Sequence, residues 1–461
     1  MSATETVHPP IATLAAALAQ GRTTSRKLVE AALARIADAA GEGGRAFTRV
    51  HAQAALLAAD ASDRLRREGV VPSPLAGLPV SIKDLFDLAG DVTTAGSTVL
   101  RETAPATRDA VAVARLRAAG SVVIGRSNMT EFAFSGIGIN PHYGTPRNPY
   151  DRGRGRIPGG SSSGAAVSVA DGMAAFALGS DTGGSVRIPA ALCGIAGFKP
   201  TRHRVPLEGA FPLSTTLDSV GPLAPSVACC ATVFQVLAGE PPQPLAPVPL
   251  AALRLGVPKN FMLDDLDLEV AQAFESAIRR LSHRGARIVD LAVPEFDEAA
   301  KANLGGGLSA PEAYAVHRER VDREREIDPR VLERILRGGS VRAFEYIELL
   351  AARSRLMRRF VRATYDDVDV LVMPTVPRIA PPIEDLERDP EAFRKANGNM
   401  LRNTSLINFL DGCALSLPVQ EPGAAPVGLM AVGFSGEDER VLSAGLAIEA
   451  ALAYQGPVLV E

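Results

Sequence analysis

The chain has 461 residues, 46% of them hydrophobic, which is enough for one large domain or two ordinary ones. Its formal net charge of -3, from 49 basic and 52 acidic side chains, produces no strong field toward nucleic acid or an anionic membrane, so we expect neither as a partner. The N-terminal residues show no signal-peptide pattern and no apolar run long enough to span a bilayer follows, which predicts a cytoplasmic protein.

Cysteine and histidine usage does not indicate a disulfide framework or a metal centre. Four cysteines are too few for such a framework, and Cys229 and Cys230 are adjacent, which is not the spacing of metal ligands. The six histidines are scattered, with no pair at ligand spacing. We therefore expect reduced, buried thiols, no metal and no cofactor.

Predicted helices and predicted strands alternate along the chain. Apolar periodicity and end signals predict helices over 11–20, 23–36, 51–67, 111–119, 165–178, 270–281 and 438–452. Short apolar runs predict strands over 75–84, 121–124, 253–257, 368–373, 414–419 and 427–432. This alternation is typical of an α/β fold in which a mixed, mostly parallel sheet is covered by helices on both faces.

Three segments between or within these elements indicate how the chain is organised. Residues 239–249 hold five prolines and are expected to form a surface connection between two halves. Residues 131–149 form a long loop rich in glycine, proline and asparagine, of the kind that often lines a binding site. The mixed-charge segment 317–337 is expected to be a solvated helical face.

The stretch 157–201 concentrates small residues around hydroxyl groups. Two glycine-rich turns, 159–164 and 181–185, flank the alanine-rich stretch, so they are expected to face one site. Glycine allows the backbone to approach a ligand closely, and consecutive N–H groups can converge on a developing negative oxygen. The second turn would place Ser185 beside its own oxyanion hole.

Lys83 follows directly on the apolar run of the 75–84 strand, so a buried strand would end in a lysine. Lysine is rarely fully buried, and the ordinary interpretation of an isolated case is a side chain that extends to solvent.

Three short patterns in the glycine and serine cluster point to rival chemistries. Ser162 occupies the centre of a G-x-S-x-G pattern, which as a nucleophile elbow would need an acid and a histidine downstream, with His203, His283 and His317 available. Residues 181–183 read Asp-Thr-Gly, but no second such turn exists to supply an aspartic-protease partner. A phosphate-binding loop would need a lysine where Ala165 stands.

Nearly the whole chain, from about residue 11 to residue 452, resembles the amidase signature family. The matching segments are GLPVSIKDLFDLAGDVTTAGS (77–97), GRSNMTEFAFSG (125–136), YGTPRNP (143–149), the block 157–201 and VDVLVMPT (368–375). The resemblance implies a single large domain over 11–455 after an N-terminal tail (1–10), with a central twisted sheet. The catalytic core would cover about 70–225, and the C-terminal half would cover 251–455.

By the same resemblance the catalytic set is Lys83, Ser161 and Ser185. Ser185 would be the nucleophile, and Ser161 a bridging serine that relatives hold in a cis peptide bond. Burial favours the neutral amine of a lysine, so Lys83 could accept the proton that Ser161 relays from Ser185. The oxyanion would be held by backbone N–H groups of the second turn, from Thr182, Gly183, Gly184 and Ser185.

The resemblance also assigns residues around the substrate. Phe134, Ser135 and Ser162 match positions near the substrate pocket of relatives. Asp181 and Arg187 match a pair that braces the central block, although Arg187 could instead recognise a carboxylate.

The resemblance to transamidation subunits that use glutamine is incomplete. Arg334 matches an arginine of those subunits, yet the aspartate that they place before an Asn-Leu-Ala-Gly-Leu-Pro motif has no clear equivalent in 402–412.

These observations predict an amidohydrolase that cleaves a small-molecule carboxamide to an acid and ammonia or an amine through a seryl acyl-enzyme. No cofactor is implied, and a homodimer is compatible with the resemblance. The alternative is the glutamine-hydrolysing subunit of a tRNA-dependent amidotransferase complex. A third interpretation, a binding module without catalysis, is disfavoured because all three catalytic positions are filled.

Overall fold

The computed structural model describes residues 9–364 and 368–453. Residues 1–8, most of the expected N-terminal tail, lie outside the described residues, as do 365–367 and the expected domain end at 455. In the described part, no helix is both long and apolar enough to cross a membrane.

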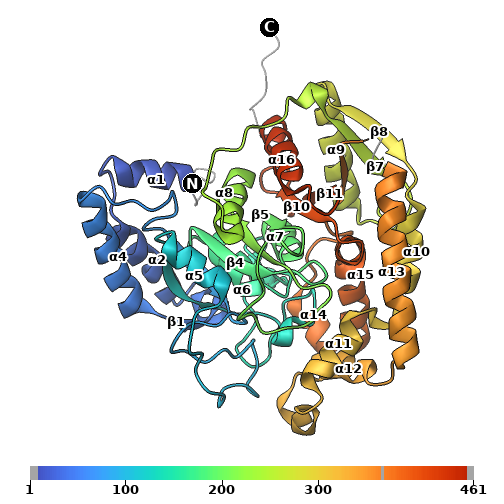
Figure 1. Ribbon diagram of the computed structural model, residues 1–461, viewed down its shortest axis with the longest axis horizontal. Helices are drawn as coiled ribbons and strands as arrows, with labels where there is room; N and C mark the ends of the chain where they lie inside the picture. Colours follow the sequence, from blue (N-terminus) through green and yellow to red (C-terminus); the bar gives the residue numbers. More distant parts are fainter. Residues whose placement is uncertain (1–8, 365–367, 454–461) are drawn as a thin grey trace.

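An eleven-stranded sheet forms the centre of the described chain, in the order β1-β3-β2-β4-β6-β5-β10-β11-β9-β7-β8. Its strands are β1 (Phe47–Val50), β2 (Pro79–Lys83), β3 (Val122–Ser127), β4 (Phe176–Ser180), β5 (Ala196–Lys199), β6 (Val220–Ala224), β7 (Arg254–Pro258), β8 (Arg287–Leu291), β9 (Val370–Pro374), β10 (Cys413–Pro418) and β11 (Gly428–Gly433). The first six strands of the order come from the N-terminal half and the last five from the C-terminal half, and the halves join where β5 pairs with β10. Figure 1 shows the two halves side by side around this continuous sheet.

The helices are α1 (Ile11–Ala19), α2 (Ser25–Ala37), α3 (Gly43–Ala46), α4 (Ala52–Arg67), α5 (Val111–Ala118), α6 (Ser163–Ala170), α7 (Arg187–Cys193), α8 (Val227–Ala238), α9 (Leu268–His283), α10 (Pro294–Ala302), α11 (Ser309–His317), α12 (Pro329–Gly338), α13 (Ala343–Thr364), α14 (Ile383–Arg388), α15 (Pro390–Phe409) and α16 (Asp438–Leu452). Short 3₁₀ helices include η1 (Glu131–Ala133) and η5 (Val321–Glu326).

Helices cover both faces of the sheet, and inner strands such as β2, β3 and β4 are buried on both sides. Successive side chains of a strand point to opposite faces. In β4, Phe176 and Leu178 belong to a core that includes residues of α5, α8 and α16, whereas Ala177 belongs to a core that includes residues of α2, α4 and α6. The predicted single-domain α/β fold with a mixed sheet is confirmed.

The prediction that the sheet is mostly parallel is wrong. Of the ten strand pairings in the described residues, four are parallel and six are antiparallel. Parallel neighbours need a crossover connection, usually helical, whereas antiparallel neighbours can follow one another directly. No helix separates β5 from β6 or β10 from β11, and each of these pairs is antiparallel.

Two local predictions also need correction. The expected helix over 165–178 ends at Ala170, and Phe176 begins β4, because a turn with Gly172 in the left-handed region separates them. The segment 317–337 is not a continuous solvated helix: it contains the end of α11, η5 and most of α12, and His317 is fully buried.

Candidate active site

Lys83 ends β2 and is completely buried. Its Nζ atom lies 2.7 Å from Ser161 Oγ and 2.9 Å from Ser180 Oγ. The interpretation of an isolated lysine that extends to solvent is therefore wrong, because β2 lies between β3 and β4 in the sheet. Burial lowers the pKa of Lys83 to about 7, against the charges of Asp181 and Asp218, so a neutral amine is well populated near neutral pH.

Ser161 lies in the first glycine-rich turn, directly before α6, and is fully buried. The Gly160–Ser161 peptide bond is cis. A Cβ atom at Gly160 would lie 2.6 Å from the backbone nitrogen of Gly138, so only glycine fits there. The backbone N–H of Ser162 donates to the carbonyl of Ser185 at 3.3 Å, which joins the two glycine-rich turns into one site as expected.

Ser185 stands in the second turn and is 3% exposed, at the wall of a cavity of about 500 Å³. Asp181 organises this turn, since its carboxylate accepts the N–H groups of Gly184 at 2.8 Å and Val186 at 3.1 Å. The Gly184 N–H is thus already bonded and is not a free oxyanion donor, contrary to the expectation. Within the described chain, the N–H groups of Thr182, Gly183 and Ser185 have no acceptor.

Arg187 and Asp181 form a fully buried ion pair. The guanidinium donates to Asp181 at 2.9 and 3.0 Å, to Asn408 Oδ1 at 2.6 Å and to the Thr404 carbonyl at 3.1 Å. Burial opposes ionisation of Asp181, but the charge and hydrogen bonds of Arg187 hold its pKa well below the ordinary value. These contacts are those of a brace between the turn and α15, and they use the donors that carboxylate recognition would need.

Two of the three predicted substrate residues line the cavity, and one does not. Phe134 and Ser135 line it together with Ser185, although the Ser135 hydroxyl already donates to Asn397 at 3.0 Å. Ser162 is fully buried behind the turn, with its hydroxyl 3.4 Å from the Ser180 carbonyl, and is not one of the described lining residues.

Arg334 of α12 reaches the same cavity from the C-terminal half. Its guanidinium carbon lies 4.4 Å from the centre of the Phe134 ring, a cation–π arrangement. Its Nε atom is buried and has no hydrogen-bond partner among the described residues. Burial lowers the pKa of Arg334 to about 10, which leaves it charged at neutral pH.

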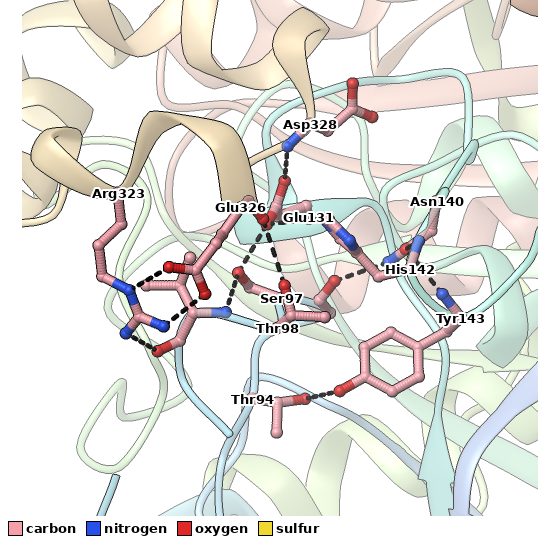
Figure 2. A network of polar contacts seen from close by, with 12 residues as sticks. Thr94, Ser97, Thr98, Glu131, Asn140, His142, Tyr143, Arg323, Glu326 and Asp328 are labelled. Carbon is pink, nitrogen blue, oxygen red and sulfur yellow. Dashed lines mark hydrogen bonds and ion pairs between the residues drawn. The ribbon is translucent and has the colours of Figure 1, made fainter. Parts of the chain in front are cut away.

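The wall segment that carries Phe134 is fixed by contacts with both halves of the chain (Figure 2). The buried Glu131 carboxylate accepts from Ser97 Oγ and from the Asp328 N–H, each at 2.6 Å, and lies 3.1 Å from His142 Nε2. The adjacent Phe132 has a φ of 52° and packs against His317 of α11, with the ring centres 4.1 Å apart and the planes tilted by 41°. The first residues of the 131–149 loop, Ala133, Phe134 and Ser135, line the cavity.

The rival assignments gain no support from the contacts. Ser162 bonds to Ser180 rather than to a histidine, while His203 and His283 are exposed. His317 packs against Phe132 and Phe211, and neither of its ring nitrogens has a hydrogen-bond partner in the described chain. Among the described residues, no three histidine, cysteine, aspartate or glutamate side chains gather where they could hold a metal ion.

Sequence reasoning missed two polar residues of the site. Ser180, which contacts Lys83, stands directly before the second turn, where a polar residue at a strand end was a usable signal. Asp218, whose charge acts on Lys83, belongs to a stretch with no recognisable motif.

Comparisons with known proteins identify the family of the chain. The sequence model of the family described as Amidase matches residues 27–442. The chain is 41% identical over 400 residues to the 2-amino-5-chloromuconic acid deaminase of Comamonas testosteroni, covering 85% of each chain. It is 35% identical over 463 residues to a glutamyl-tRNA(Gln) amidotransferase subunit from Chloroflexus aggregans, covering 93% of each.

A solved structure described as an amidase superposes with a TM-score of 0.87 at 34% identity, over 96% of this chain and 100% of that one. Because the family match and these relatives span nearly the whole sequence, the chain belongs to the amidase signature family and is a hydrolase that acts on amide bonds.

Proposed function

We propose that the protein is a stand-alone amidohydrolase that converts a small carboxamide to a carboxylic acid and ammonia or an amine. In this proposal Ser185 is the nucleophile, Ser161 the relay and Lys83 the base. The observation that carries it is the completely buried Lys83 amine, 2.7 Å from the Ser161 hydroxyl, beside the turn that presents Ser185 to the cavity.

The proton path follows from the state of Lys83. Its neutral amine accepts the proton of Ser161, which accepts that of Ser185, and Ser185 Oγ attacks the amide carbonyl carbon. The negative oxygen of the tetrahedral intermediate is held by the N–H groups of Thr182, Gly183 and Ser185, and such a donor contributes about 3 kcal/mol in comparable sites.

Collapse of the intermediate breaks the C–N bond. The proton held by Lys83 returns through Ser161 to the leaving nitrogen, and an acyl ester on Ser185 remains. Water attacks this ester by the same relay, which releases the acid and restores the Ser185 hydroxyl.

The charge of the cavity favours an anionic substrate. Its described lining has four basic side chains, Lys301, Arg334, Arg337 and Arg402, and one acidic side chain, Asp297. Arg334 is the strongest candidate to bind a carboxylate, because its Nε lacks a partner and a guanidinium matches the geometry of a carboxylate. The relative from Comamonas testosteroni is named for an acidic substrate, which supports the same class here.

The test is hydrolysis by the purified chain of matched amides with and without a second carboxylate, together with anilides, carbamates, ureas and glutamine. Ammonia or amine release should depend on Ser185 and survive a chelator. Activity that persists in Ser185→Ala but disappears with a chelator would contradict the proposal. Glutamine hydrolysis that requires copurifying subunits would instead favour the amidotransferase alternative, which the Chloroflexus aggregans relative motivates.

A further inference from the structure

A second buried carboxylate, Asp218, lies beside the nucleophile turn and has no part in the proposed relay. Strands β4 and β6 pair antiparallel, and the pairing continues past their ends: Asp181 N–H donates to the Ser219 carbonyl at 2.8 Å and Ser219 N–H donates back at 3.1 Å. The next pair in this register is Thr182 and Asp218. Thr182 Oγ1 donates to Asp218 Oδ1 at 2.5 Å.

The Asp218 carboxylate also holds a loop that lines the cavity. Its Oδ2 atom accepts the N–H of Leu213 at 2.9 Å, and the Ser214 N–H lies 3.1 Å from each oxygen. Leu213 and Leu217 line the cavity together with Thr182. One carboxylate therefore joins the turn that carries Ser185 to a loop that shapes the substrate space.

The charges of Asp181 and Asp218 both act on Lys83, and the two carboxylates differ in their surroundings. Asp181 is paired with Arg187 and lies near Lys199, so its charge is largely compensated. No basic side chain in the described chain forms an ion pair with Asp218. Burial, aided by the nearby charge of Glu312, raises the pKa of Asp218 to about 6, so it is mostly ionised at pH 7.

We propose that Asp218 is a positioning residue of this site: it fixes Thr182 in the nucleophile turn and supplies a negative charge that stabilises the Lys83 ammonium. This inference rests on the proposed function, because its consequence for the rate requires Lys83 to act as the base. It predicts that one residue sets both the geometry of the turn and the lower pH limit of activity.

Two substitutions separate these effects. Asp218→Asn keeps the size and an acceptor oxygen but removes the charge, so the acid limb of the kcat/KM profile should move down by about half a pH unit or more. The ratio of kcat/KM between the variant and the wild type should be greatest between about pH 6 and 8, because Asp218 of the wild type is ionised there. Thr182→Val removes the hydrogen bond but keeps the carboxylate, and it should lower kcat about tenfold. Because that bond lowers the pKa of Asp218, its loss should move the limb in the same direction as Asp218→Asn but less far.

Glu312→Gln is the matched control. Glu312 accepts from Thr216 Oγ1 at 2.5 Å and from Tyr346 OH at 2.7 Å, so it holds the same loop from its other side. Its removal also deletes a buried carboxylate charge, but it should not lower the apparent pKa of the acid limb. If Glu312→Gln shifts the limb as far as Asp218→Asn, the specific coupling to Lys83 is wrong.

A titration of Lys83 by ¹³C NMR of labelled lysine separates this inference from the proposed function, since it needs no turnover. A lower Lys83 pKa in Ser185→Ala/Asp218→Asn than in Ser185→Ala supports the inference even if no amide is cleaved. An unmoved acid limb in an Asp218→Asn enzyme that hydrolyses amides through Ser185 overturns the inference alone. If Asp218→Asn does not fold, the titration of the wild type is the test. The Lys83 resonance should then also shift as Asp218 ionises near pH 6, and a Lys83 resonance that shows no such shift overturns the inference.

Discussion

The turn proposed to carry the nucleophile (residues 181–187) and the α11–α12 segment (residues 309–338) both contribute to the cavity, but they are stabilised in different ways. The turn is organised locally, since one carboxylate, Asp181, bonds to N–H groups three and five residues further on and pairs with Arg187. The α11–α12 segment is placed by contacts distant in sequence, such as His317 with Phe132 and the Asp328 N–H with Glu131. Arg187 of the turn is paired with Asp181, whereas Arg334 of α12 has a buried Nε without a hydrogen-bond partner among the described residues.

This difference indicates that the two regions have different roles in the site. A turn that carries a nucleophile must be held rigidly, and local hydrogen bonds from a buried carboxylate do this at short range. The Nε of Arg334 has no hydrogen-bond partner among the described residues, so replacing Arg334 should leave the turn intact. Substitutions in the two regions should therefore affect different quantities.

The largest effect is expected at Lys83, which β2 brings to the site. Lys83→Ala should lower kcat/KM by about a thousandfold or more, because proton transfer to and from Ser161 is lost. In the wild type, kcat/KM should rise with pH through an apparent pKa of about 7.

The matched control is Lys83→Arg, which keeps the positive charge but cannot accept a proton at neutral pH, so it should not restore the rate. Near-normal turnover by this variant would contradict the lysine relay. Circular dichroism and thermal unfolding establish that both variants remain folded.

Arg187→Met tests the paired arginine of the turn. It leaves the Asp181 charge buried without its partner, and breaking such a pair costs about 3–5 kcal/mol. We expect a large fall in the free energy of unfolding, measured with urea, with loss of activity as a consequence. A variant of normal stability whose KM alone rises for anionic amides would instead identify Arg187 as a carboxylate ligand.

Arg334→Met is the corresponding change in α12. Because the Arg334 Nε has no partner to lose among the described residues, the stability should change little. KM for amides with a second carboxylate should rise about 10- to 100-fold, and KM for neutral amides should stay within about twofold. An equal rise for both classes would indicate that Arg334 shapes the wall rather than binding a charge.

The smallest effect on activity is expected for His317→Phe. Burial depresses the pKa of His317 to about 4, so between pH 6.5 and 4 the unfolded chain binds a proton there that the folded chain does not. The wild type should lose stability as the pH falls through this window, and the variant should lose less. Thermal unfolding at pH 7 and pH 5 measures the difference, and equal losses in the two proteins would contradict it.

The sequence by itself determined the parts of the site that depend on local chemistry. The Asp-Thr-Gly-Gly-Ser order specifies a turn in which glycines allow close approach, and Asp181 bonds within it. The apolar runs that predicted strands correspond to β2, β3, β7, β9, β10 and β11. β1, β4, β5, β6 and β8 were not predicted, since short or alanine- and glycine-rich strands carry little periodicity.

The tertiary structure alone decided which distant residues meet. The burial of Lys83 follows from the place of β2 inside the sheet, and no pattern within residues 75–84 specifies that β4 becomes its neighbour. Arg334 and Asp218 reach the site through the packing of α12 and the register beyond β6. Family resemblance alone singled out Arg334, and nothing in the sequence singled out Asp218. Hydrophobicity and turn preference are encoded locally, whereas strand order, burial and the charges around a buried amine depend on contacts between residues far apart in the chain.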